Sequence, residues 1–176
     1  MMLNYRDAIG YLYILREHIR KIDTKGLFEY YCPRVRATEE EVLAWESKYH
    51  VCLPNSYKNF LMAANGWKCV SQDKDLLSLE ELTLLKNDKY IEARDFCINN
   101  LKNTGNPDLL LPIAASDFSY DLYLLVLDKK TEYYGQVIWV AGEEIERYKD
   151  FDSFFLSLIE YNKYNYELIT GTKYQE

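Results

Sequence analysis

The sequence predicts an α+β fold in which helices pack on a mainly antiparallel sheet, with an extra helix at the N-terminus. Apolar residues recur at three- and four-residue steps through residues 4–22 and again through 38–66, which is typical of amphipathic helices. Three short runs rich in Val, Ile, Tyr and Trp lie between residues 110 and 141, each bounded by turn residues, as strands are. Of the 176 residues 48% are hydrophobic, enough for one domain with a substantial core.

The first helix is expected over residues 4–22. Asn4 can cap its start, and Arg20 and Lys21 lie near its C-terminal end, where positive charge complements the helix dipole. Gly26 ends the pattern, and Cys32-Pro33 indicates irregular chain before the next element. Its predicted apolar face consists of Tyr5, Ile9, Leu12, Leu15, Ile19 and Ile22.

A second helix is expected to begin at Thr38. The Thr38 side chain can accept from the backbone N–H of Glu41, and the Glu41 side chain can reach back to the N–H of Thr38, which is a capping box. Val42, Trp45 and Tyr49 form the predicted buried stripe of this helix.

Leu53-Pro54 separates that helix from a third, in which Pro54 suits the first helical position because no N–H is needed there. Asn65-Gly66 is expected to close this helix, with Gly66 in the left-handed conformation. The two short helices then form a compact hairpin. The buried stripe of the third helix is Tyr57, Phe60, Leu61 and Ala64.

The rest of the chain predicts the sheet and a closing helix. Residues 76–85 suggest a short strand and a helical turn capped by Ser78, and we interpret residues 88–102 as helix and 103–107 as loop. The runs 110–114, 121–127 and 136–141 suit an antiparallel meander of three strands. Asp152 is expected to cap the last helix, with Phe154, Phe155, Leu158 and Ile159 facing inward and a frayed tail after Ile169.

Composition excludes several classes of function. The net charge of -7 repels a phosphate backbone, so nucleic-acid binding is not favoured, whereas a basic protein partner would be attracted. The four cysteines form no C-x-x-C pair and only two histidines exist, so no metal or other cofactor is expected. With no signal peptide and no apolar stretch of membrane-spanning length, we expect a cytoplasmic protein with reduced thiols and no membrane association.

Catalysis is also not expected. His18 lies on the polar side of the first helix and His50 follows the second, and neither belongs to a recognisable catalytic motif. The sequence contains no P-loop and no G-x-G-x-x-G. We therefore do not expect this protein to be an enzyme.

Three segments together resemble the SUKH superfamily, also called SMI1/KNR4. They are TEEEVLAWESKYHVCLPNSYKNFLMAANGW (residues 38–67), LLPIAASDFSYDLYLLVLD (residues 110–128), and GQVIWV followed by FDSFFLSLI. The resemblance implies an SMI1/KNR4-like domain over residues 37–165, an N-terminal helix and linker over 1–36 packed on it, and a frayed tail over 166–176. The residues that match the family's structural motif are Glu41, Trp45, Leu53, Pro54, Tyr57, Phe60, Leu61, Asn65 and Gly66.

The resemblance also implies binding instead of bond-making. Many bacterial members look like immunity proteins, so it implies a protein that occludes a cognate toxin domain, such as a nuclease or another toxin that acts on nucleic acid. The alternative is a regulatory adaptor that binds a cellular protein. The first helix and residues 86–109 depart from the family pattern, and each can either tune partner choice or add core.

The candidate contact residues combine acidic and aromatic side chains, as a surface against a basic partner would. For the acidic ones a solvated turn is the competing interpretation, and for the aromatic ones it is a ring folded onto the core. Glu39, Glu40 and Glu41 could also form an acidic patch, but helix capping explains them better. The candidates are Trp67, Asp117, Phe118, Tyr120, Asp121, Glu143, Glu144 and Glu146.

Overall fold

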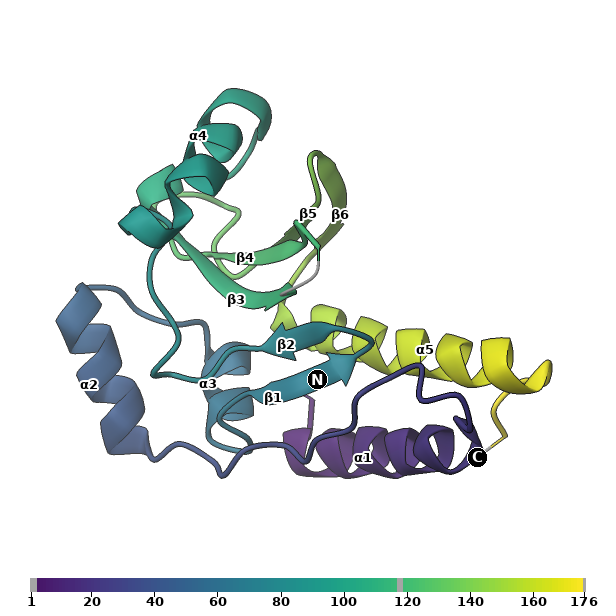
Figure 1. The fold of residues 1–176 in the computed structure, drawn as a ribbon. Coiled ribbons are helices and arrows are strands. Elements are labelled where there is room, and N and C mark those ends of the chain that lie inside the picture. The colour runs from purple at the N-terminus through teal and green to yellow at the C-terminus, as the bar shows by residue number, and fades with distance from the viewer. Residues whose placement is uncertain (1–2, 117–118, 176) are drawn as a thin grey trace.

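The computed structural model describes residues 3–116 and 119–175, and Figure 1 shows helices on both faces of one sheet. The α-helices of this part of the chain are α1 (Tyr5–Ile22), α2 (Glu39–Tyr49), α3 (Asn55–Leu61), α4 (Ile91–Asn100) and α5 (Phe151–Thr170). Short 3-10 helices η1 (Asp88–Tyr90) and η2 (Pro107–Leu109) flank α4. The strands are β1 (Trp67–Ser71), β2 (Lys74–Leu76), β3 (Leu110–Ser116), β4 (Leu122–Val126), β5 (Val137–Val140) and β6 (Glu144–Tyr148). The α+β fold class is therefore confirmed.

The six described strands form one sheet in the order β1-β2-β3-β4-β5-β6, and every neighbouring pair is antiparallel. The predicted meander of three strands is present as β3, β4 and β5. The prediction was incomplete, however, because β1 and β6 add a strand at each edge. The strand expected within residues 76–85 lies earlier, at Lys74–Leu76.

Alternating side chains divide the central strands between two apolar clusters, because successive residues of a strand point to opposite faces. Leu111, Ile113, Tyr123, Leu125 and Val137 belong to the main core, which they share with α1, α3 and α5. Leu110, Leu124, Val126, Ile138 and Val140 belong to a smaller cluster on the other face, with Tyr90 and Cys97. The α4 segment therefore covers the face of the sheet that the main core leaves open (Figure 1).

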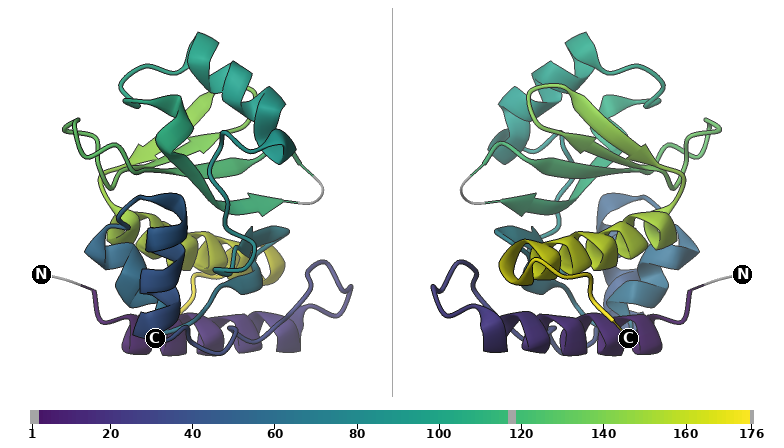
Figure 2. Two further views of the ribbon diagram at one scale, coloured as in Figure 1. Left: turned by 90° about the vertical axis from the view of Figure 1, so that its left-hand side faces the viewer. Right: turned by 90° about the vertical axis from the view of Figure 1, so that its right-hand side faces the viewer.

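Helix α1 begins as predicted, because the Asn4 side chain accepts from the backbone N–H of Arg6 at 3.2 Å. Its buried apolar residues are Tyr5, Ala8, Ile9, Leu12, Leu15 and Ile19. These residues pack in the main core beside α5, and the two helices run next to each other in Figures 1 and 2. This helix is thus part of the core.

A buried arginine joins α1 to three other segments. The Nη1 atom of Arg16 donates to the carbonyl oxygen of Val70 on β1 (3.1 Å) and to Oδ1 of Asn162 on α5 (3.0 Å). Its Nη2 atom donates to the carbonyl oxygen of Glu29 in the linker (2.7 Å). Burial lowers the pKa of the Arg16 guanidinium to about 10. Through these hydrogen bonds to uncharged oxygens, the Arg16 side chain holds α1, the linker, β1 and α5 together.

The start of α5 differs from the prediction. Asp150 is the N-cap, since its Oδ1 accepts from the backbone N–H of Ser153 at 2.8 Å. Asp152 instead accepts from the Tyr5 hydroxyl (2.5 Å) and from the backbone N–H of Leu3 (3.1 Å), so it fastens α1 to α5. The predicted inward residues are buried: Phe154, Phe155, Leu158 and Ile159.

The segment predicted to fray, residues 166–176, begins as helix in the part that the structure describes. Helix α5 continues to Thr170 and ends at Gly171, which has a positive φ of 69°. Tyr174 then packs back on the core, and its hydroxyl lies 2.9 Å from Nδ1 of His18 on α1. The tail is held because its aromatic residues find partners on α1 and α5 that the local sequence does not reveal.

The α2–α3 hairpin carries the residues of the family motif. The capping box is present: the Thr38 N–H donates to Oε2 of Glu41 (2.7 Å), and the Glu41 N–H donates to Oγ1 of Thr38 (3.2 Å). The indole N–H of Trp45 donates to the carbonyl oxygen of Leu82 at 3.3 Å. The remaining apolar motif residues are buried and pack in the core, as Leu53, Tyr57, Phe60 and Leu61 show. Pro54 is the N-cap of α3 and not its first helical residue.

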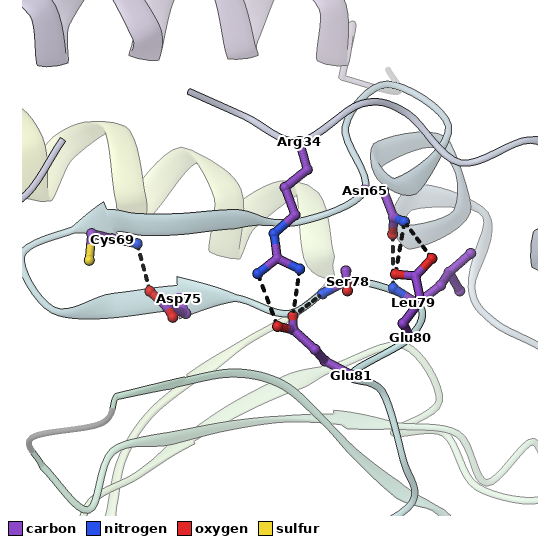
Figure 3. Close-up of polar contacts among 8 residues, drawn as sticks. All are labelled: Arg34, Asn65, Cys69, Asp75, Ser78, Leu79, Glu80 and Glu81. Carbon is purple, nitrogen blue, oxygen red and sulfur yellow. Dashed lines mark hydrogen bonds and ion pairs between the residues drawn. The ribbon is translucent and has the colours of Figure 1, made fainter. Parts of the chain in front are cut away.

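Asn65 and Gly66 do not close α3, which ends at Leu61. The Asn65 side chain instead binds the chain that follows β2 (Figure 3). The Asn65 side chain accepts from the backbone N–H of Leu79 (2.8 Å) and donates to the Glu80 carboxylate (3.2 Å). Gly66 has a φ of +85°, and a Cβ there would lie 2.7 Å from the carbonyl oxygen of Leu76. Glycine is required because the backbone that leaves β2 passes directly over it.

Figure 3 also shows an ion pair between Arg34 of the linker and Glu81 in the segment after β2. Arg34 donates to both carboxylate oxygens of Glu81 (3.0 and 2.9 Å), and the same carboxylate accepts from the backbone N–H of Ser78 (2.8 Å). Arginine and carboxylate in this bidentate geometry fix orientation as well as charge. The linker, the Asn65 turn and the segment after β2 are therefore locked together, and the motif residues act structurally.

Candidate protein-binding groove

The structure separates the candidate contact residues into a buried one and a cluster at one end of the sheet. Trp67 is fully buried, and its indole N–H donates to the carbonyl oxygen of Tyr31 at 2.8 Å. Its ring belongs to the core, so Trp67 is not a contact residue. Asp117 and Phe118 lie outside the described residues.

The remaining candidates come together from two separate turns. Tyr120 and Asp121 directly precede β4, and Glu143 and Glu144 lie where β6 begins. In the sheet Leu122 pairs with Val140, and Val140 pairs with Glu144. The start of β4, the end of β5 and the start of β6 therefore lie side by side.

Three of the four carboxylates in this cluster already bind neighbouring groups. Asp121 accepts from the indole N–H of Trp139 and from the Ser119 hydroxyl, so it positions the turn. Glu144 forms an ion pair with Arg147 at 2.8 Å.

Glu146 accepts from the Tyr148 hydroxyl at 2.7 Å. Glu143 is exposed and follows Gly142 directly. Of the three predicted glutamates, Glu143 is therefore the one best suited to meet a partner.

A groove of about 680 Å³ opens between this end of the sheet and α4, and we call it the α4 groove. Its described lining consists of Asp88, Lys89, Tyr90, Ile91, Glu92, Ala93, Phe96, Ala115, Ser116, Ser119, Tyr120, Asp121, Leu122, Val140 and Gly142. Tyr120 stands at the groove with 93% of its surface exposed. The sequence pointed to the sheet side of the groove but not to the residues of η1 and α4.

Polar contacts attach α4 and the loop that follows it to η2 and to β6. Arg94 forms an ion pair with Asp108 of η2 at 2.7 Å. Arg147 of β6 donates to the carbonyl oxygens of Lys102 (3.0 Å) and Asn103 (2.8 Å) in the loop after α4. None of the α4 residues that line the groove takes part in these contacts.

The groove combines apolar walls with a predominantly negative rim. Asp88, Glu92 and Asp121 contribute carboxylates, and Lys89 contributes the one described ammonium of the lining. Such a surface attracts positive charge while its apolar floor favours desolvation. It repels the phosphates of a nucleic acid.

The described lining of the groove contains no Ser-His or Cys-His pair. None of its described lining residues is histidine or cysteine. His18 contacts Tyr174 on the far side of the molecule, and His50 is the left-handed C-cap of α2. Cys97 is on the buried face of α4, and burial raises the pKa of its thiol to about 12, which suppresses the nucleophilic thiolate.

The described residues contain neither a metal-binding cluster nor a membrane-spanning helix. Across residues 3–116 and 119–175, no group of three or more His, Cys, Asp or Glu side chains has an arrangement that could hold a metal ion. In the same part of the chain, no helix combines the length and the apolar character needed to cross a bilayer.

Comparison with protein families gives a match over most of the chain. The model of the SMI1/KNR4 family (SUKH-1) matches residues 36–157, well over half of the chain. The matched segment begins at the end of the linker, includes the sheet and α4, and stops within α5. No curated protein matches the chain.

Proposed function

Because the chain belongs to the SMI1/KNR4 family (SUKH-1), we propose that it is an immunity protein that binds a cognate bacterial toxin domain and neutralises it. The family membership and the form of the α4 groove both support this proposal. The protein acts as a binding partner and contributes no chemical step of its own.

One observation carries the proposal: the α4 groove is an apolar surface on a well-packed scaffold with a predominantly acidic rim. Apolar surface that a fold does not use for its own core typically marks an interaction site. The groove and the neighbouring turns lie at one end of the sheet, so they can share one interface of roughly 800 Å² per partner.

The mechanism is occlusion of a basic active site. A toxin that acts on nucleic acid needs a positively charged cleft to hold phosphates. The immunity protein, with a net charge of -7, is drawn to such a cleft and covers it. The acidic rim then occupies positions where phosphates would otherwise bind.

The test is neutralisation of the toxin domain encoded by the neighbouring reading frame. Co-expression should restore growth of cells that produce this toxin domain, and the purified protein should inhibit the toxin in a stoichiometric complex. A complex in which the toxin remains fully active would contradict neutralisation by occlusion, and a stable complex with a cellular protein instead of a toxin would favour a regulatory adaptor. Absence of both binding and rescue would refute the proposal.

Charge reversal at Glu143 tests whether this end of the sheet faces the toxin. Glu143→Lys should lower the association rate constant at low salt to about one third of the wild-type value. The difference between variant and wild type should shrink as salt screens the charges. Glu132→Lys is the matched control, because Glu132 is also exposed but lies in the β4–β5 connection at the opposite end of β4. Equal rate constants for the two variants would remove Glu143 from the interface.

A further inference from the structure

The two walls of the α4 groove come from separate parts of the chain and leave the apolar surface between them open. Ile91 and Phe96 of α4 form one wall, and Leu122 and Val140 of the sheet form the other. Tyr90, at the start of α4, is buried in the smaller apolar cluster beneath them. The interior of the groove therefore favours an apolar group.

Helix α4 leaves part of its apolar surface outside the smaller apolar cluster. Ile91 is 48% exposed and Ile98 is 49% exposed, although both are large apolar residues. Only Cys97 among the residues of α4 is fully buried. Ile91 lines the groove, whereas Ile98 does not.

The charges at the rim define what can flank the apolar group. Asp88 and Glu92 stand on the α4 side and Asp121 on the sheet side, while Lys89 lies over the ring of Tyr90 at 5.0 Å. Carboxylates on both sides favour a segment with positive charge before and after its apolar residue. A second copy of this chain, itself carrying a net charge of -7, does not supply that pattern on average.

We propose that the α4 groove takes one large apolar side chain, such as Trp or Leu, from a segment of the toxin that is flanked by lysine or arginine. This inference rests on the proposed function and adds the chemistry of the docking segment to it. A volume of about 680 Å³ is in the range that encloses a drug-sized ligand, so the groove accommodates an aromatic anchor and the stems of its neighbours. Such buried aromatic anchors dominate binding at protein interfaces.

Short synthetic peptides test the groove without knowledge of the toxin. The probes are Lys-Leu-Trp-Leu-Lys, the acidic analogue Glu-Leu-Trp-Leu-Glu, and Lys-Gly-Ser-Gly-Lys, which lacks the apolar residues. The basic apolar peptide should cause saturable amide shifts in NMR spectra at residues 90–96, 119–122 and 140–142. Shifts of equal size with either analogue, shifts centred elsewhere, or no saturable shift would overturn the proposal.

Two matched variants of α4 provide the control. Ile91→Arg should weaken binding of the basic apolar peptide about tenfold, because it places a like charge in the groove. Ile98→Arg makes the same change at a position of equal exposure outside the groove, and it should leave the affinity unchanged. An equal effect of the two variants would contradict the assignment of the site.

The same variants separate this inference from the proposed function. Neutralisation of the toxin by both Ile91→Arg and Ile98→Arg would keep the immunity function and reject the groove as its docking site. Specific binding of the basic apolar peptide without neutralisation of any neighbouring toxin would keep the groove and reject the immunity function.

Discussion

Helices α1 and α4 lie at opposite ends of the molecule, and they use their apolar residues differently (Figure 2). Helix α1 buries six apolar residues in the main core, from Tyr5 to Ile19. Helix α4 buries only Cys97 and leaves Ile91 and Ile98 about half exposed. Both segments were unexplained by the family resemblance, and the structure shows that α1 adds core whereas α4 offers surface.

The polar contacts of the two helices differ in the same way. Helix α1 is fixed by the buried Arg16 and by the Tyr5–Asp152 hydrogen bond, both of which reach distant parts of the chain. Helix α4 depends on partly exposed contacts, such as the Arg94–Asp108 ion pair and the Arg147 bonds to the following loop. Segments with few buried contacts open at lower free energy than the core. We therefore expect α1 to unfold with the whole domain and α4 to open locally.

The largest difference should come from buried positions. Leu15→Ala in α1 should reduce the free energy of unfolding by about 3 kcal/mol, because Leu15 is fully buried and the truncation leaves a cavity. Cys97→Ala in α4 should reduce the free energy of unfolding by only about 1 kcal/mol, since fewer atoms are removed and α4 can shift to fill the space. Urea denaturation measures both. Equal losses would mean that α4 belongs to the same cooperative unit as α1.

Replacement of Arg16 tests whether its hydrogen bonds hold the α1 region together. Arg16→Met should destabilise the protein by about 2 kcal/mol, because the oxygens of Glu29 and Asn162 lose this donor and the Val70 oxygen keeps only the bond from the Asn162 amide. Burial lowers the pKa of Arg16, so the charge itself is disfavoured in the folded state and the loss arises from the missing hydrogen bonds. Arg16→Lys keeps the charge but not the fork of donors and should also be less stable than wild type, as thermal denaturation would show. A fully stable Arg16→Met protein would contradict the role given to this side chain.

Thiol labelling sharpens the comparison of local stability. Cys97 is 1% exposed with its pKa raised to about 12, and Cys69 of β1 is 6% exposed with its pKa raised to about 11. The thiolate is the reactive form, so static burial and pKa alone make Cys97 the slower of the two at neutral pH. If α4 opens locally, Cys97 should instead be labelled about tenfold faster than Cys69 under native conditions. Mass spectrometry of the labelled peptides distinguishes the two orders.

The smallest effect concerns the exposed isoleucines of α4. Ile91→Ser and Ile98→Ser should each change the free energy of unfolding by less than about 0.5 kcal/mol, because neither side chain is buried. Chemical denaturation again provides the measurement. If Ile91→Ser reduced the free energy of unfolding as much as Leu15→Ala does, the groove wall would be shown to stabilise the fold. The inference that this wall is kept for a partner would then fail.

Local signals in the sequence predicted much of the fold. The capping box at Thr38, the apolar periodicity of α1 and the β-rich runs of β3, β4 and β5 each specify their element within a few residues. Strand β6 was missed because Glu144–Tyr148 reads as a charged turn, and only its pairing with β5 makes it a strand. The cap of α5 was placed at Asp152 because both Asp150 and Asp152 suit that role locally, and the contact with Tyr5 lies far away in sequence.

The sequence indicated only some of the residues at the groove. It drew attention to Tyr120 and Asp121, which line the groove, and to Glu143 beside it, because acidic and aromatic residues occur together in turns. Ile91 and Phe96 carried no such signal, because α4 has only weak amphipathic character and its position over the sheet is a long-range contact. Trp67 was ambiguous for a related reason: an aromatic residue after a glycine turn does not show which way its ring points.

The sheet ends in two different kinds of edge, and this bears on self-association. The linker lies against the start of β1, where the Arg34 N–H donates to the carbonyl oxygen of Gly66 at 3.0 Å. Strand β6 forms the other edge and exposes Glu144, Ile145 and Glu146. Antiparallel joining of two molecules through β6 would bring the same carboxylates face to face, and charged edge strands resist such growth into filaments. One border of the sheet is therefore covered by the linker and the other carries charged side chains, an arrangement that disfavours edge-to-edge growth of the sheet.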